Sequence, residues 1–357
     1  MPRIARNLLL TIVVVALLYG VDYLLANGVG GFNVSPFHQR ILMLSGIAIT
    51  LAVSLNLIIG YTGQFSLGHA GFMAVGAYSG AYFTINYGER LAASLGGGTL
   101  GAFVEFSLAT LIGALAAAIA GLIVGVPSLR LKGDYLAIVT LGFGQIIVVL
   151  INNIDTVGGA RGYSGIPIVK SFFWIFLVAA ATIVIVHNIT KSAFGRALIS
   201  IREDELAAEA MGVNTTRYKV MAFVISSAMA GAAGVLFAHF DGYLNPHSFE
   251  FLKSVEILIM VILGGLGSIV GSVIGAVALT ILPEALRQFA EYRMIIYSLL
   301  LIILMITRPQ GLLGGLDPFK GWRARRRAKS RTEAEEITAE DTRGPIQVDK
   351  EGTGTHR

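Results

Sequence analysis

The side chains that could perform chemistry in this sequence are few, and their spacing fits neither hydrolysis nor metal binding. The six histidines stand apart from one another, the pattern His-Glu-x-x-His is absent, and no cysteine is available as a nucleophile or metal ligand. The dipeptide Gly-Lys never occurs, which excludes a phosphate-binding loop of the G-x-x-x-x-G-K-[ST] type. The sequence therefore predicts a protein that is not an enzyme, holds no metal and hydrolyses no nucleotide by itself.

The elements that must position the remaining polar side chains are apolar helices. Of the 357 residues, 55% are hydrophobic and only 14% are charged, whereas soluble domains carry about 25% charged residues. Apolar runs of the length that spans a bilayer recur almost throughout the chain. This composition predicts an all-α polytopic membrane protein. It excludes a disordered protein, a disulfide scaffold and a nucleic-acid-binding domain. The net charge of +5 is therefore not a sign of DNA binding, and the basic residues are used to predict membrane topology.

About ten membrane passes are predicted, some of them short or broken. The run Val255–Leu282 is too long for one ordinary span, and Gly264, Gly265 and Gly267 interrupt it, so it is predicted to cross twice with a helix break between. The other predicted spans are Leu8–Ala26, Ile41–Gly60, Ala70–Tyr87, Thr99–Val126, Tyr135–Ile151, Ser171–Ile189, Tyr218–Phe240 and Met294–Ile306.

Lysine and arginine in the short loops predict the orientation, because positive loops stay in the cytoplasm. With residues 255–282 crossing twice, most basic residues fall inside, and both termini are predicted to be cytoplasmic. The polybasic juxtamembrane segment 320–331 suits anionic headgroups, although a simple stop-transfer flank has the same composition. Residues 332–357 are polar without apolar periodicity and are predicted to form a disordered tail. Residues 1–319 remain as the transmembrane domain.

No charged residue falls convincingly at the centre of a predicted span. Glu105 lies near the start of its span, and Glu256 lies near an outer end. A transporter coupled to an ion gradient ordinarily buries such groups along its path. The driving force is therefore expected to come from another subunit.

One sizeable loop, residues 190–219, lies on the predicted cytoplasmic side before the tail. Charges of both signs occur from Arg202 to Glu205, and strong helix formers follow them. Gly212 is placed to end that helix, and either Asn214 or Thr215 can cap the next one. The pattern predicts a short amphipathic helix, a glycine turn and a second helix that enters the membrane. Such a loop either presents a face to a cytoplasmic partner or is a passive linker.

Four separated segments and one short motif resemble a known family. The segment 195–214 (GRALISIREDELAAEAMGVN) is similar to the EAA-type coupling loop of ABC importer permeases, and in particular to the LivM branch of branched-chain amino acid permeases. Further matching segments are 56–78 (NLIIGYTGQFSLGHAGFMAVGAY), 133–147 (GDYLAIVTLGFGQII), 258–275 (LIMVILGGLGSIVGSVIG) and 308–312 (RPQGL). The resemblance covers about residues 40 to 315 and implies the helical architecture of an ABC importer permease.

The resemblance implies a set of partners for this chain. A second related permease would form a heterodimer with it, two cytoplasmic ATPases would bind ATP and Mg, and an external protein would deliver the substrate. The chain itself would bind no cofactor and no nucleic acid, and it would lie in the inner membrane of a prokaryotic cell. The residues implied to form the ATPase-coupling loop are Arg202, Glu203, Asp204, Glu205, Ala207, Ala208, Glu209, Ala210, Gly212 and Asn214. Among them, Glu209 is expected to make contact and Gly212 to make the turn.

A glycine-rich polar segment separates two of the predicted spans. Irregular backbone at membrane depth is tolerated only where protein or a water-filled cavity satisfies it, so this segment is predicted to line the translocation path. An ordinary turn in the cytoplasm remains the alternative. The predicted path residues are Gly60, Tyr61, Gly63, Gln64, Ser66, Gly68, His69 and Gly71.

Most of the remaining glycines are predicted to let helices approach closely. The patterns Gly76-x-x-x-Gly80, Gly121-x-x-x-Gly125 and Gly267-x-x-x-Gly271-x-x-x-Gly275 place small residues on one helix face. The substrate is less determined by sequence, because specificity in this class lies largely in the external binding protein. Branched-chain aliphatic amino acids are expected, and the alternative is an importer of urea, short-chain amides or another amino acid.

Overall fold

The computed structural model describes residues 35–94, 98–129, 133–169 and 171–286, with single positions at 20, 96, 131, 292, 298, 299, 302 and 303. All of these belong to the first of the two units into which the chain divides, Met1–Gly314 and Gly315–Arg357. The predicted first span, most of the last predicted span, the polybasic segment and the tail lie outside the described residues.

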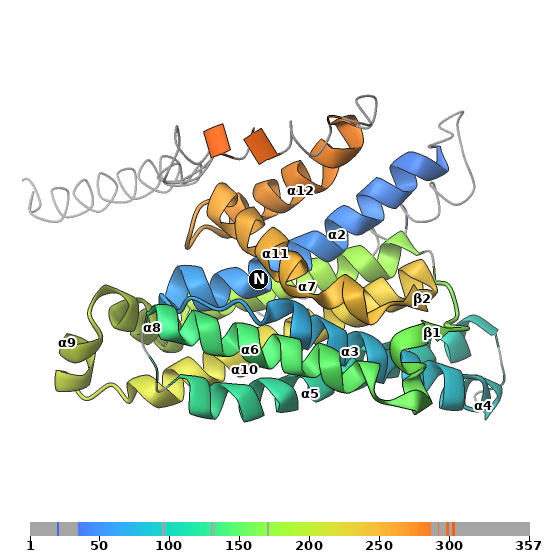
Figure 1. Ribbon diagram of the computed structural model, residues 1–357, viewed down its shortest axis with the longest axis horizontal. Coiled ribbons are helices and arrows are strands. Elements are labelled where there is room, and N and C mark those ends of the chain that lie inside the picture. Colours follow the sequence, from blue (N-terminus) through green and yellow to red (C-terminus); the bar gives the residue numbers. More distant parts are fainter. Residues whose placement is uncertain are drawn as a thin grey trace, which may run out of the picture. The chain divides into compact units, whose positions relative to one another are not determined.

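The described part of the chain is almost entirely helical (Figure 1). Five of its helices are long and apolar enough to cross a membrane. The helices in chain order are α2 (Pro36–Asn56), α3 (His69–Phe83), α4 (Glu89–Ser94), α5 (Gly98–Ser128), α6 (Asp134–Asn152), α7 (Phe172–Lys191), α8 (Ala193–Glu203), α9 (Glu205–Ala210), α10 (Thr215–Asp241), α11 (Phe251–Gly264) and α12 (Ile269–Ala285). One π-helical turn, Leu57–Tyr61, continues α2, and another, Thr84–Gly88, continues α3. The predicted fold class, an all-α polytopic membrane protein, is confirmed.

The centre of the bundle is formed by α3, α5 and α10, with α2 packed against α10. Small residues set how closely these helices approach. A Cβ atom at Gly76 of α3 would overlap the backbone of Gly231 of α10, and one at Gly121 of α5 would contact Ser227 of α10. Without a hydrophobic driving force in lipid, such close backbone packing is a main source of helix association. The predicted packing role of these glycines is confirmed.

The long apolar run Val255–Leu282 forms parts of two short antiparallel helices, α11 and α12. Helix α11 has 14 residues and α12 has 17, so at 1.5 Å per residue they are about 20 to 25 Å long, shorter than a hydrocarbon core of about 30 Å. Gly265 and Gly267 in the turn between them have φ angles of 109° and 76°, a region in which a Cβ atom is strained. The hairpin packs on α2 through α12 (Figure 1).

The bundle has two distinct ends (Figure 1). At one end lie α8 and α9, and this is called the α9 end. At the other, β1 (Tyr163–Ser164) pairs in antiparallel register with β2 (Tyr243–Leu244), with Tyr163 opposite Leu244, and this is called the β end. Short 3-10 turns at Asp155–Val157, Gly159–Arg161 and Pro246–Phe249 complete the β end. Helix α2 runs from the β end, where Arg40 pairs with Asp241 at 3.7 Å, to the α9 end.

Candidate functional site

The loop between α7 and α10 folds as two short helices whose starts are set by side-chain caps. The backbone of Asp204 is extended (φ −155°, ψ 110°), which ends α8. Its carboxylate accepts a hydrogen bond from the Ala207 amide at 3.0 Å and so begins α9. Asn214 caps α10 in the same way, accepting from the Arg217 amide at 3.0 Å. The short helix predicted before Gly212 is α9, and Asp204 separates it from α8, which was not predicted.

Gly212 makes the turn that follows α9. Its φ is +84°, its amide donates to the Glu209 carbonyl at 2.9 Å, and the Val213 amide donates to the Ala208 carbonyl at 3.0 Å. This is the Schellman arrangement, in which a left-handed residue satisfies the last carbonyls of a helix. No atom lies within 4 Å of the place where a Cβ at Gly212 would stand. A side chain there would cost about 1 kcal/mol through backbone strain alone.

Two carboxylates of α9 hold this helix against α10. Glu205 accepts from the Lys219 ammonium at 2.6 Å, and the Lys219 side chain is only 8% exposed. Glu209 accepts from the Thr215 hydroxyl, also at 2.6 Å. Hydrogen bonds to charged groups are worth more than neutral ones, so these two contacts fix the position of α9. Glu209, expected from sequence to contact a partner, has its carboxylate engaged within the loop.

The outward face of α9 is apolar. Ala208 is buried against the bundle, whereas Leu206 is 70% exposed and Met211 is 84% exposed. Both exposed side chains belong to a loop in which charged residues recur from Arg202 to Glu209. Leu206 and Met211 were not among the coupling-loop residues expected from sequence. The signal that could have found them is two large apolar residues in an otherwise charged loop.

The loop is tied to the transmembrane helices through a small set of polar contacts, called here the coupling cluster. The Arg202 guanidinium donates through Nη1 to the Gly60 carbonyl at 2.8 Å. The side chain of Asn56, fully buried at the end of α2, donates to the Ser268 carbonyl at 3.2 Å and accepts from the Gly267 amide at 2.9 Å. The coupling cluster comprises these five residues and joins α8, the end of α2 and the α11–α12 turn. Asn56 was not predicted from sequence, although a single amide side chain within an apolar run could have identified it as a polar contact residue.

The glycine-rich segment between α2 and α3 is irregular, and its buried and exposed side chains alternate. Gly63 has a φ of +72°, and the side chains of Gln64, Ser66 and His69 are at most 5% exposed. His69 shares a hydrogen bond of 2.9 Å with the Ser54 hydroxyl through Nε2. Within the described residues, the Gln64 amide and the Ser66 hydroxyl have no hydrogen-bond partner. Buried polar atoms without partners are costly, so this segment has unused capacity to bind a polar group.

The other predicted path residues pack close to α6 or to the coupling cluster. A Cβ atom at Gly68 would come within 2.6 Å of the Thr140 carbonyl oxygen, and one at Gly71 within 2.9 Å of the Gly144 Cα. Tyr61 is half-buried in the π-helical turn. A cavity of about 240 Å³ lies between this segment and the α8–α9 loop, and Gln64 and Arg202 both line it. The structure thus brings the two sequence-predicted groups of residues side by side.

A bundle of apolar helices with short, broken spans and a structured loop at one end has the architecture of a polytopic membrane protein. The comparisons give its family. The family described as branched-chain amino acid transport system / permease component matches residues 37–306. The chain belongs to this family. The resemblance noted in the sequence is therefore confirmed, and so is the prediction that the chain is a transport permease subunit rather than an enzyme.

Named relatives agree with this assignment. The chain is 37% identical to the high-affinity branched-chain amino acid transport system permease protein LivM of Salmonella typhimurium over 317 residues, which covers 79% of this chain and 71% of the relative. The LivM protein of Escherichia coli strain K12 gives the same identity and coverage. The LivH permease protein of that strain is 35% identical over 169 residues, or 46% of this chain and 54% of the relative. No solved structure matches the chain.

Proposed function

We propose that this chain is the LivM-type permease subunit of an ATP-driven importer that carries branched-chain aliphatic amino acids. The observation that carries the proposal is the α8–α9 loop, which presents an exposed apolar face at the α9 end and is hydrogen-bonded to the spans through Arg202. Family membership and the 37% identity to LivM proteins support the substrate class. The chain moves solute and contributes no catalytic step.

The partners follow from the same reasoning. ATPase subunits dock on α9 and bind ATP and Mg, and the described part of the chain has no group of three or more metal-ligating side chains. A LivH-type permease completes the pair, since the chain resembles both LivM and LivH proteins. The α9 end faces the cytoplasm of a prokaryotic cell, the β end faces outward and receives the external binding protein, and both termini are cytoplasmic.

Coupling proceeds through the cluster beneath the loop. Closure of the ATPase pair displaces α9, which is fixed to α10 by Glu205 and Glu209. Arg202 transmits the displacement to Gly60, and Asn56 transmits it to the α11–α12 turn. Gln64, whose buried amide has no hydrogen-bond partner among the described residues, lines the same cavity as Arg202, so a shift there opens or closes the inner end of the path.

Docking predicts a loss of ATPase binding when the apolar face of α9 acquires a charge. Leu206→Asp should reduce co-purification of the ATPases about tenfold or more, because a desolvated interface contact becomes an unpaired charge. The measurement is the ATPase-to-permease ratio in affinity-purified complexes. Thr216→Asp adds the same charge at an exposed position in the first turn of α10 and should leave the ratio unchanged. Equal ratios for Leu206→Asp and wild type would contradict docking on α9.

The substrate class predicts a defined uptake defect. Cells lacking this gene should lose a high-affinity component of labelled leucine uptake that unlabelled isoleucine and valine compete for and urea does not. The measurement is initial uptake rate against leucine concentration, with a plasmid-borne copy as the control. Unchanged leucine uptake would remove branched-chain amino acids as the substrate and leave urea, short-chain amides or another amino acid to be tested.

A further inference from the structure

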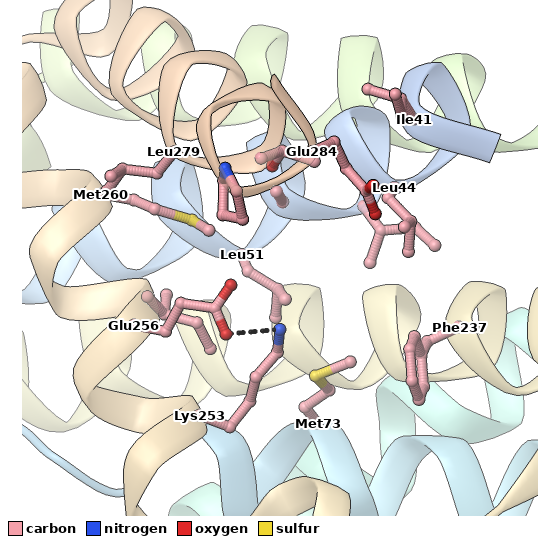
Figure 2. A pocket seen from close by; sticks show the side chains of 15 residues that line it. Ile41, Leu44, Leu51, Met73, Phe237, Lys253, Glu256, Met260, Leu279 and Glu284 are labelled. Carbon is pink, nitrogen blue, oxygen red and sulfur yellow. Dashed lines mark hydrogen bonds and ion pairs between the residues drawn. The ribbon is translucent and has the colours of Figure 1, made fainter. Parts of the chain in front are cut away.

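A second cavity, remote from the coupling cluster, lies toward the β end of the bundle between α2, α10, α11 and α12, and its floor includes Met73 of α3 (Figure 2). Its volume is about 160 Å³. An apolar protein cavity of about 150 Å³ is large enough to bind benzene, so this one accommodates a branched aliphatic side chain. Its apolar walls are Ile41, Leu44, Ile47, Ala48, Leu51, Met73, Phe237, Ile257, Met260 and Leu279.

Three charged groups border this apolar cavity. The Lys253 ammonium pairs with the Glu256 carboxylate at 2.9 Å, and the two side chains are 30% and 39% exposed. Glu284 comes from α12 on the other side of the cavity (Figure 2) and is partly buried. Within the described residues the Glu284 carboxylate makes no hydrogen bond or ion pair. The lining therefore offers one cation and one unpaired carboxylate at the edge of an aliphatic surface.

We propose that this cavity is the outward-side binding site for a zwitterionic aliphatic α-amino acid, an inference that rests on the proposed function. Lys253 binds the substrate carboxylate alongside Glu256, Glu284 binds the substrate ammonium, and the side chain enters between Leu51, Met73 and Met260 of the walls. Charge-assisted hydrogen bonds to both ends fix the orientation of the substrate, and the apolar walls reward a branched side chain.

An ion pair that only stabilises α11 would explain the contact between Lys253 and Glu256 but would not explain the cavity or Glu284. Lys253 and Glu256 are one turn apart on α11 and need no cavity to pair. The cavity beside these two residues does not contribute to their ion pair. Nor does Glu284 on its other side, whose carboxylate has no partner among the described residues. A half-buried carboxylate without a partner is unfavourable, and the ammonium of an amino acid would satisfy it. Urea is neutral and carries no charge that would pair with Lys253 or Glu284.

The position of the cavity also connects it to the coupling cluster. Lys253 and Glu256 lie in the first turns of α11, and Glu284 lies in the last turn of α12. The opposite end of the same hairpin is the turn whose Gly267 and Ser268 are held by Asn56. Both sides of the cavity thus belong to short helices that move with this turn, so displacement of the turn separates Lys253 from Glu284 and releases the substrate.

The test uses the complete transporter with its partner permease, ATPases and binding protein in proteoliposomes. A leucine analogue with a diazirine in its side chain is photo-crosslinked, and the labelled peptides are identified by mass spectrometry. We expect label on cavity residues of α2, α11 or α12, and competition by leucine. Glu284→Gln and Lys253→Met should each lower both labelling and leucine transported per ATP about tenfold or more.

Two further variants separate binding from assembly. Glu89→Gln changes an exposed carboxylate of α4 at the same end of the bundle and should leave labelling and transport unchanged. Ala48→Leu fills part of the cavity without touching a charge and should lower labelling by leucine's analogue in a fully assembled complex. Two results would overturn the inference and leave the proposed function standing. In the first, the complex imports leucine but the label lies on residues outside the cavity. In the second, labelling and transport are unchanged in Glu284→Gln, Lys253→Met and Ala48→Leu. Failure of the wild-type complex to import leucine would instead overturn the proposed function.

Discussion

Arg202→Met should uncouple substrate uptake from ATP hydrolysis. Loss of the guanidinium leaves the buried Gly60 carbonyl without the 2.8 Å hydrogen bond that joins α8 to the end of α2. A hydrogen bond from a charged donor is worth about 1.5–3 kcal/mol, so we expect uptake per ATP to fall at least about tenfold. The measurement is leucine transport together with phosphate release by the reconstituted complex, in the presence of the loaded binding protein.

The matched control is Arg196→Met on the same helix. Arg196 is exposed, and within the described residues its guanidinium makes only a long contact of 3.4 Å to the Lys191 carbonyl, so its removal should change neither quantity. Methionine keeps the apolar stem in both variants, which confines the difference to the guanidinium. Equal transport per ATP in Arg202→Met and wild type would show that the Gly60 contact does not carry the motion.

Gly76→Leu should strongly destabilise the permease. A Cβ at Gly76 would overlap the backbone of Gly231, and a Cβ at Gly113 would come within 2.8 Å of the Gly76 carbonyl oxygen. Three helices therefore meet at this point with no room for a side chain. Overpacking costs 1–3 kcal/mol and sometimes more, and with three rigid helix backbones in contact we expect a loss of about 3 kcal/mol in the free energy of unfolding. The measurement is the thermal midpoint and monodisperse yield of the detergent-purified complex.

Gly142→Leu provides the comparison at another helical glycine. No atom lies within 4 Å of the Cβ position at Gly142 of α6, and glycine within a helix is itself unfavourable by about 0.5–1 kcal/mol relative to alanine. This variant should match or slightly exceed the wild-type midpoint. A Gly76→Leu protein as stable as Gly142→Leu would refute the close approach of α3 and α10.

The sequence was sufficient for most of the local structure. Apolar runs predicted α2, α3, α5, α6, α7, α10, α11 and α12, and the glycines after Leu263 predicted that the long run divides into two. Gly212 and Asn214 were predicted at the turn and cap where they occur. These features depend on periodicity and on the conformational preferences of single residues, which neighbouring sequence specifies. Helix α8 and its end at Asp204 were not predicted, because a run of charges does not by itself show which aspartate serves as a cap.

The tertiary structure alone decided which of these residues act together. Arg202 meets Gly60 across 142 positions, and Asn56 meets Ser268 across 212. No local pattern specifies such pairs, since they depend on how whole helices pack once small residues allow their backbones to approach. The same packing engages Glu209 within the loop, exposes Leu206 and Met211, and places Lys253 across a cavity from Glu284. Composition and motifs therefore determined that the chain is a membrane permease, and three-dimensional packing determined the contacts that link the α8–α9 loop to the spans.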